Sequence, residues 1–432
     1  MNLLIVSYVY APDRSPRAYR WTALAEHWSG QGHRIDVISG WKQGDSRLER
    51  RGGVAIHRVG GGMIERLRAL LGQTSHRAAA MPKPTDARRG MPSRAANLIY
   101  SATLKKLFWP DYAFHWYPAA LARARALCRA TPYDAVITVS HPFTPHLVGL
   151  TVKRRWPALR WLVDIGDPFS LLDEIPLNNA ALYRRLNHRA EAAVLRGADA
   201  VAVTVARCRS DLATAFPVTP DKIAVIPPLL SLPANAATGT RSRPKNESHL
   251  VFIGTLYRAL RDPSYLLSLF QALHRRRQGL HLHFYGALND CAPCFAAIDP
   301  ALAGHVHCHG MVPRETVAAA MRDADILVNI GNATAHQLPS KLVEYAAAAR
   351  PILNLASAAA DTAVDFLAGY PSALTILSDR PQPDRAAVES ALAFIDAPRP
   401  IEPAVIARFL LPYTIERVAA GYAGLLLPCP AA

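Results

Sequence analysis

A short stretch in the last quarter of the chain has residue types and spacing suited to holding an anion. Residues 331–355 read GNATAHQLPSKLVEYAAAARPILNL. Pro339 suits the first turn of a helix, and Ser340 can satisfy an unpaired backbone N–H there. The N–H groups of Ser340, Lys341 and Leu342 would then point at the anion, and Lys341 adds a positive charge. The pattern predicts a phosphate-binding helix start.

Glu344 lies one helical turn beyond that start, on the same side of the helix. A carboxylate in this place can accept two hydrogen bonds from the vicinal hydroxyls of a ribose. Phosphate and ribose contacts together indicate a nucleotide. An ordinary capped helix with a solvated glutamate has the same spacing, so the spacing alone leaves both interpretations open.

Polar side chains also follow other apolar runs of the sequence. Arg258 and Arg261 follow LVFIGT, and guanidinium groups bind phosphate oxygens and offset the charge of a leaving group. Two surface arginines would look the same. His141 follows one apolar run of the first half, and Asp164 and Asp167 end the next. These three could contact a ligand or an acceptor hydroxyl, or they could order their own loops.

Cysteines and histidines gather in the segment CAPCFAAIDPALAGHVHCHG, at Cys291, Cys294, His305, His307, Cys308 and His309. The Cys-x-x-Cys spacing is typical of zinc sites. The last residues read as a strand, in which alternate side chains point to opposite faces, so the three histidines could share one face. We expect no metal here.

Short apolar runs alternate with helical patterns along most of the chain. This β-α-β rhythm predicts parallel sheets covered on both faces, arranged as two doubly wound, Rossmann-like α/β domains. The N-terminal domain is expected at 1–232, a Pro- and Ser-rich linker at 233–248, and the C-terminal domain at 249–412. A helix at 413–427 is expected to pack back on the N-terminal domain. Ligands of such sheets lie at the carboxyl ends of the strands, which predicts a site in a central cleft.

The composition excludes several classes of protein. Half of the 432 residues are hydrophobic, which argues against disorder. No apolar run reaches the roughly 18 residues of a membrane span, and the N-terminus does not resemble a signal peptide. Six cysteines without a regular framework suit a reducing cytosol. We expect a cytoplasmic protein.

Positive charge is concentrated in the first half of the chain. The net charge is +16, and residues 1–210 hold 31 basic and 15 acidic side chains. Within them, residues 64–106 carry nine Lys or Arg, with large apolar residues interleaved. This mixture suits docking on the anionic inner face of the cytoplasmic membrane, and equally suits a solvated helical face. No nucleic-acid module is recognisable.

Five segments, in this order, resemble the family 4 glycosyltransferases, which have the GT-B fold of two facing Rossmann-like domains. They are LLIVSYVYAP, WTALAEHWSGQGHRIDVIS, FIGTLYRALRDPSYLL, HCHGMVPRETVAAAMRDADILVNI and LPSKLVEYAAAARPIL. The resemblance covers nearly the whole chain, and the order of the segments makes it more specific than any one of them.

The resemblance implies roles for individual residues. It places Glu344 on the ribose, and Ser340, Lys341 and Leu342 near the diphosphate of a nucleotide-sugar donor. Arg258 and Arg261, in the loop that contains Gly254, would contact the same diphosphate. His141 would lie beside the donor sugar. We take His141, Arg258 and Lys341 as catalytic in this reading.

The sequence departs from the family pattern at two places. The family usually has a second glutamate eight positions before Glu344, and this chain has His336 there. Because that glutamate lies near the donor sugar in the family, we expect the sugar to be oriented differently here. The glycines that often follow the first strand are replaced by APDRSPRAYR. Arg17 or Arg20 could supply contacts there instead, and with Asp164 and Asp167 they form the acceptor side of the expected site.

The sequence therefore predicts a retaining glycosyltransferase that uses a UDP- or GDP-sugar and needs no cofactor or metal. The acceptor would be a glycan or lipid-linked sugar of surface polysaccharide or glycoconjugate biosynthesis. Two alternatives stay open: a non-catalytic sugar-nucleotide-binding or scaffold homologue, and a two-domain sugar-nucleotide epimerase. Turnover with any donor would exclude the first. Donor consumption that requires an acceptor would exclude the second.

Overall fold

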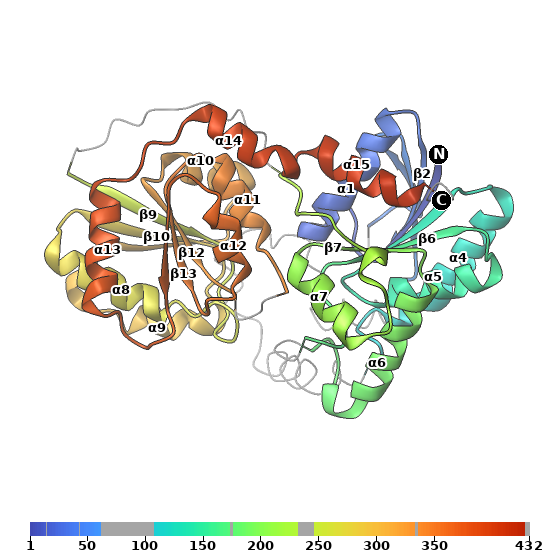
Figure 1. Cartoon of the computed structure of the whole chain (residues 1–432), viewed down its shortest axis with the longest axis horizontal. Helices are drawn as coiled ribbons and strands as arrows, with labels where there is room; N and C mark the ends of the chain where they lie inside the picture. Colours follow the sequence, from blue (N-terminus) through green and yellow to red (C-terminus); the bar gives the residue numbers. More distant parts are fainter. Residues whose placement is uncertain are drawn as a thin grey trace. The chain divides into compact units, whose positions relative to one another are not determined.

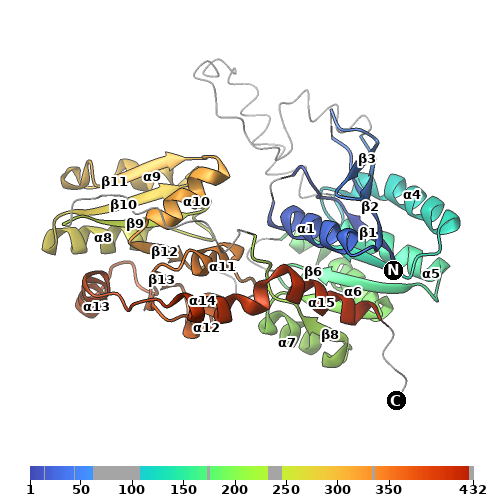
Figure 2. The same ribbon diagram turned by 90° about the horizontal axis from the view of Figure 1, so that it is seen from above.

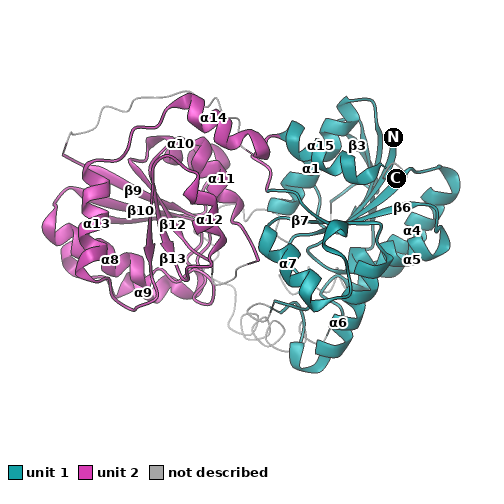
Figure 3. Cartoon of the chain, viewed as in Figure 1, with its two compact units in different colours: residues 1–227, 415–432 teal, residues 228–414 magenta. Residues whose placement is uncertain are grey.

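A computed structural model describes most of the chain, namely residues 1–13, 15–42, 44–61, 108–172, 176–231, 246–332 and 336–427. The chain forms two compact units, each described here by itself (Figure 3). Unit 1 comprises residues 1–227 and 415–432, and unit 2 comprises residues 228–414. The predicted basic stretch 64–106 and most of the predicted linker lie outside the described residues.

Unit 1 is built on an eight-stranded sheet of order β3-β4-β2-β1-β5-β6-β7-β8 (Figure 1). All neighbouring strands are parallel except β3, which pairs antiparallel with β4. The strands are β1 Asn2–Ser7, β2 Arg34–Gly40, β3 Leu48–Arg51, β4 Val54–Val59, β5 Ala135–Val139, β6 Arg160–Ile165, β7 Ala200–Val203 and β8 Ile223–Val225.

Six α-helices of unit 1 are described: α1 Pro16–Gly30, α4 Tyr117–Ala130, α5 Thr144–Arg155, α6 Ala180–Gly197, α7 Ala206–Ala215 and α15 Ile415–Leu426. Helix α1 begins where Ser15 accepts a hydrogen bond from the Ala18 N–H and Pro16 fixes the first turn. Its buried face carries Trp21 and Trp28, whose rings contact Tyr422 of α15. The last helix of the chain therefore belongs to the core of unit 1.

Unit 2 is built on a six-stranded parallel sheet of order β11-β10-β9-β12-β13-β14 (Figure 2). Its strands are β9 Ser248–Ile253, β10 Leu280–Tyr285, β11 Val306–Gly310, β12 Ile326–Ile330, β13 Ile352–Ala356 and β14 Ala373–Leu377. Its helices are α8 Ser264–Arg276, α9 Ala292–Ala296, α10 Arg314–Asp323, α11 Ser340–Ala347, α12 Thr362–Ala368, α13 Arg385–Asp396 and α14 Pro403–Leu410.

Side-chain alternation in β10 explains how the two faces of the unit 2 sheet differ. Leu280, Leu282 and Phe284 are buried and join the hydrophobic core, which also contains Leu266 and Phe270 of α8. The residues between them, including His281 and His283, are only partly buried and lie on the other face.

The predicted fold class of two doubly wound α/β domains is confirmed. The prediction missed the antiparallel strand β3, because LERR is short and polar and has no apolar pattern. It also missed β14, whose residues are mostly exposed or half-buried at the edge of the sheet. Within the described residues, no helix is both long and apolar enough to cross a membrane.

Candidate functional site

Lys341 lies in the first turn of α11 in unit 2, and its ammonium is buried. The Nζ atom is 4.3 Å from the centroid of the Phe252 ring and has no hydrogen-bond partner among the described residues. Burial, and the nearby Arg261 guanidinium, hold the pKa of Lys341 well below its usual value. A buried ammonium without a hydrogen-bond partner is costly, so this position is suited to an anion from outside the chain.

The backbone approaches the Lys341 ammonium closely at Gly254, directly after β9. Gly254 has a φ of 145°, and a Cβ atom there would lie 3.4 Å from Lys341 Nζ. Gly286, after β10, faces it: a Cβ at Gly286 would lie 2.2 Å from the Gly254 carbonyl oxygen. Side chains at these positions would strain the loop, so the two glycines keep the backbone close to the ammonium.

Arg261, rather than Arg258, turns towards this place. The Arg261 Nε donates to the Asn332 Oδ1 at 2.7 Å, and Asn332 follows β12, the neighbour of β9. Arg258 is exposed, and its guanidinium contacts Cys294 Sγ at 3.5 Å. The structure thus brings Gly254, Arg261 and Lys341 together, and it does not bring Arg258 into the group.

Asp361 is a member of this group that the sequence analysis missed. One oxygen caps α12 by accepting from the Ala363 N–H at 2.9 Å, and the other has no hydrogen-bond partner among the described residues. Burial raises the pKa of Asp361, and Lys341 opposes that rise. An aspartate before a helix reads as an ordinary cap in the sequence, so only the fold reveals its second neighbour.

Glu344 is held by an arginine from the preceding helix. Arg314, at the start of α10, places its Nη2 atom 3.3 Å from Glu344 Oε1 and 3.0 Å from the Ser231 carbonyl oxygen. Burial raises the pKa of Glu344, and Arg314 lowers it. The carboxylate is therefore positioned before any ligand binds. The sequence analysis did not single out Arg314, although it quoted the segment that contains it.

The start of α11 differs from the prediction in two details. Helix α11 begins after Pro339, and no side chain caps it, so Ser340 does not have the predicted capping role. The Leu342 N–H donates to the Pro339 carbonyl at 2.9 Å and is not available to an anion. The helix starts with a tight turn that satisfies this donor internally. His336 lies partly buried in the loop between β12 and α11.

In unit 1, most of the predicted acceptor-side residues form a buried hydrogen-bond network. Asp164 is fully buried, and its oxygens accept from Trp21 Nε1 at 2.8 Å and Tyr422 Oη at 2.6 Å. Arg20 is also buried, and donates to Tyr422 Oη at 2.8 Å. Asp164 and Arg20 therefore join α1, β6 and α15, which is a structural role.

Arg17 links the loops that follow two neighbouring strands. Its guanidinium forms an ion pair with Asp164 at 2.9 Å and donates to the Ser140 carbonyl at 2.6 Å. Ser140 follows β5. Gly166 follows β6, the neighbouring strand, and a Cβ atom at Gly166 would lie 2.7 Å from Arg17 Nη2. Arg17 keeps some solvent exposure, with 15% of its side chain accessible. Its contacts fix the carboxyl edge of the unit 1 sheet.

Two buried carboxylates position the loops that carry His141 and Asp167. Asp111 accepts from the N–H groups of Phe143 and Thr144, at 2.7 and 2.9 Å, just after His141. Glu191 accepts from the Phe169 N–H at 2.7 Å, two residues after Asp167. His141 and Asp167 are both partly exposed at the same edge of the sheet. Neither supporting carboxylate has a sequence signal, because each is remote in sequence from the loop it holds.

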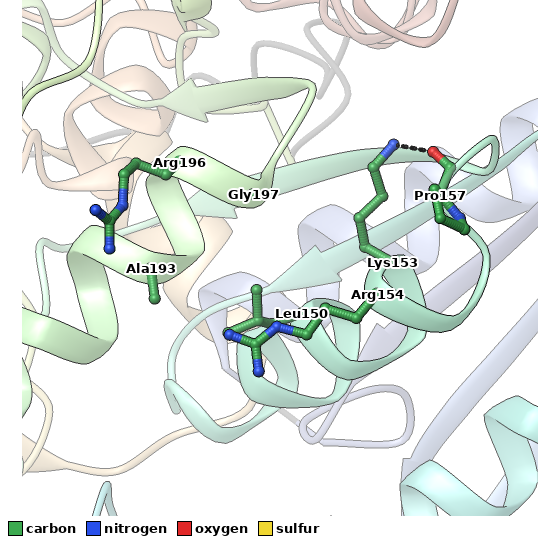
Figure 4. A pocket seen from close by; sticks show the side chains of 7 residues that line it. All are labelled: Leu150, Lys153, Arg154, Pro157, Ala193, Arg196 and Gly197. Carbon is green, nitrogen blue, oxygen red and sulfur yellow. Dashed lines mark hydrogen bonds between the residues drawn. The ribbon is translucent and has the colours of Figure 1, made fainter.

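A surface pocket of unit 1 lies away from these residues, between α5 and α6 (Figure 4). Its basic side chains are Lys153, Arg154 and Arg196. Lys153 is engaged, donating to the Pro157 carbonyl at 2.8 Å and to Asp199 at 2.7 Å. None of the predicted site residues lines this pocket.

The cysteine–histidine segment contains no metal cluster in the described residues, by which we mean three or more His, Cys, Asp or Glu side chains placed to hold an ion. Cys291 and Cys294 both lie near Arg258 rather than near the histidines. Strand β11 carries His307 and His309, whose rings stack on rings of the neighbouring strand β10.

Comparison with known proteins adds independent information. The family model for glycosyl transferases group 1 matches residues 247–373, and that for the glycosyl transferase 4-like domain matches residues 18–228. No curated protein matches the sequence.

Several solved structures share the fold across the whole chain. The HepE protein of Anabaena in complex with UDP-glucose is 10% identical, with a TM-score of 0.60 and 99% of each chain covered. The lipopolysaccharide outer core galactosyltransferase WaaB is also 10% identical, with a TM-score of 0.59 over 99% of each chain. A glycosyltransferase from Rickettsia africae is 13% identical, with a TM-score of 0.57, covering 98% of this chain and 97% of the other.

Proposed function

Because the chain belongs to the group 1, family 4 glycosyltransferases with the GT-B fold and is a nucleotide-sugar glycosyltransferase, we propose how its residues serve that reaction. Unit 2 binds the nucleotide-sugar donor and unit 1 presents the acceptor. Transfer retains the anomeric configuration. The observation that carries this proposal is the buried Lys341 Nζ atom, which has no hydrogen-bond partner among the described residues.

The donor diphosphate lies against Lys341 and Arg261, with the Gly254 backbone beside it. Charged hydrogen bonds of this kind are short and about twice as strong as neutral ones. Asn332 holds Arg261 in place. Asp361, whose pKa is raised by burial, can donate a hydrogen bond to an oxygen of the bound donor when it is protonated. Glu344 accepts hydrogen bonds from the ribose hydroxyls.

In the transfer step, the acceptor oxygen attacks the anomeric carbon from the same face of the sugar ring that the diphosphate leaves. The bond between the anomeric carbon and the phosphate oxygen breaks, and a bond to the acceptor oxygen forms on the same face. The acceptor proton passes to the departing phosphate, so no separate protein base is needed. The positive charges of Lys341 and Arg261 stabilise the departing diphosphate, and the proposed step requires no metal.

A ligand screen tests the donor assignment. We expect UDP- or GDP-sugars to raise the melting temperature, because a ligand that binds only the native state stabilises it. UDP-glucose is the first ligand to try, since the Anabaena structure of the same fold contains it. Turnover is then measured with and without glycan acceptors. Binding without any turnover would identify a scaffold, and donor conversion without acceptor would identify an epimerase.

The acceptor is a glycan or lipid-linked sugar of surface polysaccharide or glycoconjugate biosynthesis, reached at the inner face of the cytoplasmic membrane. The support for this part is the charge of residues 1–210, which hold 31 basic and 15 acidic side chains. In the described part of unit 1, Arg154 and Arg196 are exposed basic residues beside the pocket of Figure 4.

We expect the protein to bind anionic vesicles at low salt and to leave them near molar salt. Each Lys or Arg near an anionic surface contributes about 1 kcal/mol, and the attraction fades over a Debye length of about 8–10 Å. Charge reversal at Arg88, Arg89 and Arg94, in the basic stretch, should weaken vesicle binding and leave nucleotide affinity unchanged. Co-sedimentation measures the first and calorimetry the second. Indifference to anionic vesicles at low salt would contradict the membrane proposal.

A further inference from the structure

The sheet of unit 2 carries an unusual row of histidines on one face. They lie on or beside the adjacent strands β9, β10 and β11 (Figure 2), and we call them the imidazole ladder: His249, His281, His283, His305, His307 and His309. The sequence analysis noted only the last three. Parallel pairing aligns His281 with His249 and His283 with His307, which brings the two sets together.

The rings of the ladder stack at close range. The His283 ring centroid lies 4.5 Å from that of His307 and 5.3 Å from that of His309, with interplanar angles of 15° in both pairs. The His249 and His281 centroids are 5.0 Å apart. At these separations two imidazolium charges would repel each other strongly, because a half-buried sheet face screens charge less well than water.

Three contacts join ring nitrogens directly. His249 Nδ1 lies 2.9 Å from His283 Nε2, and His283 Nδ1 lies 3.0 Å from His309 Nε2. His281 Nδ1 lies 3.2 Å from His307 Nε2. A hydrogen bond between two imidazoles needs one N–H and one bare nitrogen, so at least one ring in each pair must be neutral. Protonation of both rings would place two donors against each other.

The groups packed around the ladder supply little compensating charge. Glu247 lies 3.5 Å from His249 Nε2, and an Asp325 oxygen accepts from the His249 backbone N–H. Helix α8 adds another imidazole, His274, with its ring 4.2 Å from His305, and the Tyr285 ring stacks on His309 at 4.1 Å.

Helix α10, which contacts β9, brings charged residues of both signs: Arg314, Glu315, Arg322 and Asp323. Two other side chains near the ladder are engaged elsewhere. Arg277 donates to Ser248 Oγ and pairs with Asp396, and Cys308 lies between His307 and His309 in β11, where alternate side chains point to opposite faces.

Burial and the neighbouring imidazoles lower the pKa of His283 to about 3. The same causes lower the pKa values of His281, His307 and His309. These four rings are therefore neutral at neutral pH, and the nitrogen contacts require at least one neutral ring in each pair. The described residues contain no group of three or more potential ligands placed to hold a metal ion.

The strands of the ladder lead into the candidate donor site. Strand β9 ends at Ile253, whose N–H donates to Tyr345 Oη at 2.8 Å, and Gly254 follows. Tyr345 is adjacent to Glu344 in α11. Strand β10 ends at Tyr285, before Gly286, which packs against Gly254.

We propose that the imidazole ladder is a proton-sensitive element that destabilises unit 2 when the surroundings become mildly acidic. The expected loss of stability follows from the ladder alone and does not rest on the proposed function. Its consequence, weaker donor binding at low pH, rests on the proposed function of Gly254, Lys341 and Glu344.

The direction follows from linkage between folding and proton binding. Histidine in an unfolded chain has a pKa of about 6.5. Burial and the neighbouring imidazoles lower the pKa values of His281, His283, His307 and His309 in the folded ladder. Its stabilising contribution is complete above about pH 6.5 and is lost as the pH falls, because the unfolded chain then binds more protons. Each of these four histidines can raise the unfolding equilibrium constant by up to about tenfold per pH unit.

Hydrogen exchange on the full chain without nucleotide tests the proposal, because it reports each unit separately. After correction for the intrinsic pH dependence of exchange, protection of β9–β11 should fall by about tenfold or more between pH 6.5 and pH 5. Protection of β1, β2 and β5 should change far less. All seven tryptophans lie in unit 1, so their fluorescence independently confirms that this unit stays folded.

The variant His283→Gln keeps a donor and an acceptor but cannot titrate in this range, and should make the fall in β9–β11 protection less steep. His309→Gln, at the exposed end of the ladder, is the second variant if His283→Gln does not fold. His188→Gln, in unit 1, is the control. Protection of β9–β11 that does not change with pH would overturn the proposal. So would a fall in protection that is equally steep in the unmodified protein, in His283→Gln and in His309→Gln.

Discussion

Replacing Lys341 with methionine is expected to abolish tight nucleotide binding and, at the same time, to stabilise the protein. The ammonium is buried beside Phe252 without a hydrogen-bond partner among the described residues. Loss of one partner of a buried charge pair costs about 2–5 kcal/mol, so donor affinity should fall by roughly 30-fold to several thousand-fold. Calorimetry with the donor found in the ligand screen measures this loss.

The stability of the same variant should change in the opposite direction. Methionine has a similar length, can contact the Phe252 ring through its sulfur, and removes the cost of burying an ammonium that has no hydrogen-bond partner. Each kcal/mol gained should raise the melting temperature of a unit of this size by about 2–4 °C. Lys222→Met, in unit 1, is the control, and should alter nucleotide affinity little. Unchanged affinity in Lys341→Met would remove Lys341 from the donor site.

The pH dependence of donor binding offers a second measurement on Lys341. Its pKa is lowered in the free protein, and a bound diphosphate favours the charged form. Donor affinity should therefore fall as the pH rises through the lowered pKa, and binding near that pH should take up protons. Calorimetry in two buffers of different ionisation enthalpy detects the uptake. Lys341→Met should show neither effect.

Replacing Glu344 with alanine should weaken donor binding about tenfold or more. Hydrogen bonds to a charged group contribute about 1.5–3 kcal/mol, and the ribose would lose its carboxylate acceptor. Glu315→Ala, an exposed glutamate on α10, is the matched control and should leave the affinity unchanged. Equal affinities in Glu344→Ala and in the parent protein would show that the ribose lies elsewhere.

Arg314 should affect donor binding through Glu344. Its removal distinguishes an effect on the charge of Glu344 from a direct contact between Arg314 and the donor. Burial raises the pKa of Glu344 and Arg314 lowers it, so Arg314→Ala should raise that pKa further. A carboxylate is lost as the pH falls through its pKa, so donor affinity in Arg314→Ala should begin to fall at a higher pH than in the parent. A uniform loss at all pH values would indicate direct contact with the donor.

The order of the elements could be predicted from the sequence because it depends on local patterns. The apolar runs at residues 135–139 and 326–330 form β5 and β12, since a strand buried on both faces is apolar throughout. The edge strand β14 and the polar β3 lack that signal and were missed. The helical patterns near residues 264–277 and at residues 313–323 form α8 and α10, whose ends in the structure lie within one residue of these bounds.

The sequence by itself determined that the chain has two α/β domains, because apolar runs and helical patterns alternate along it, and the family resemblance made Lys341, Glu344 and Arg261 candidates for one nucleotide site. Only the tertiary structure decided that Arg261 turns inward while Arg258 stays exposed, and that Asp164 and Arg20 are buried in a network with Tyr422. It also decided that six histidines, on three neighbouring strands and just before one of them, stack on one face. These outcomes depend on strand order and on contacts between residues far apart in the sequence, which set burial and charge environment, and no local pattern encodes them.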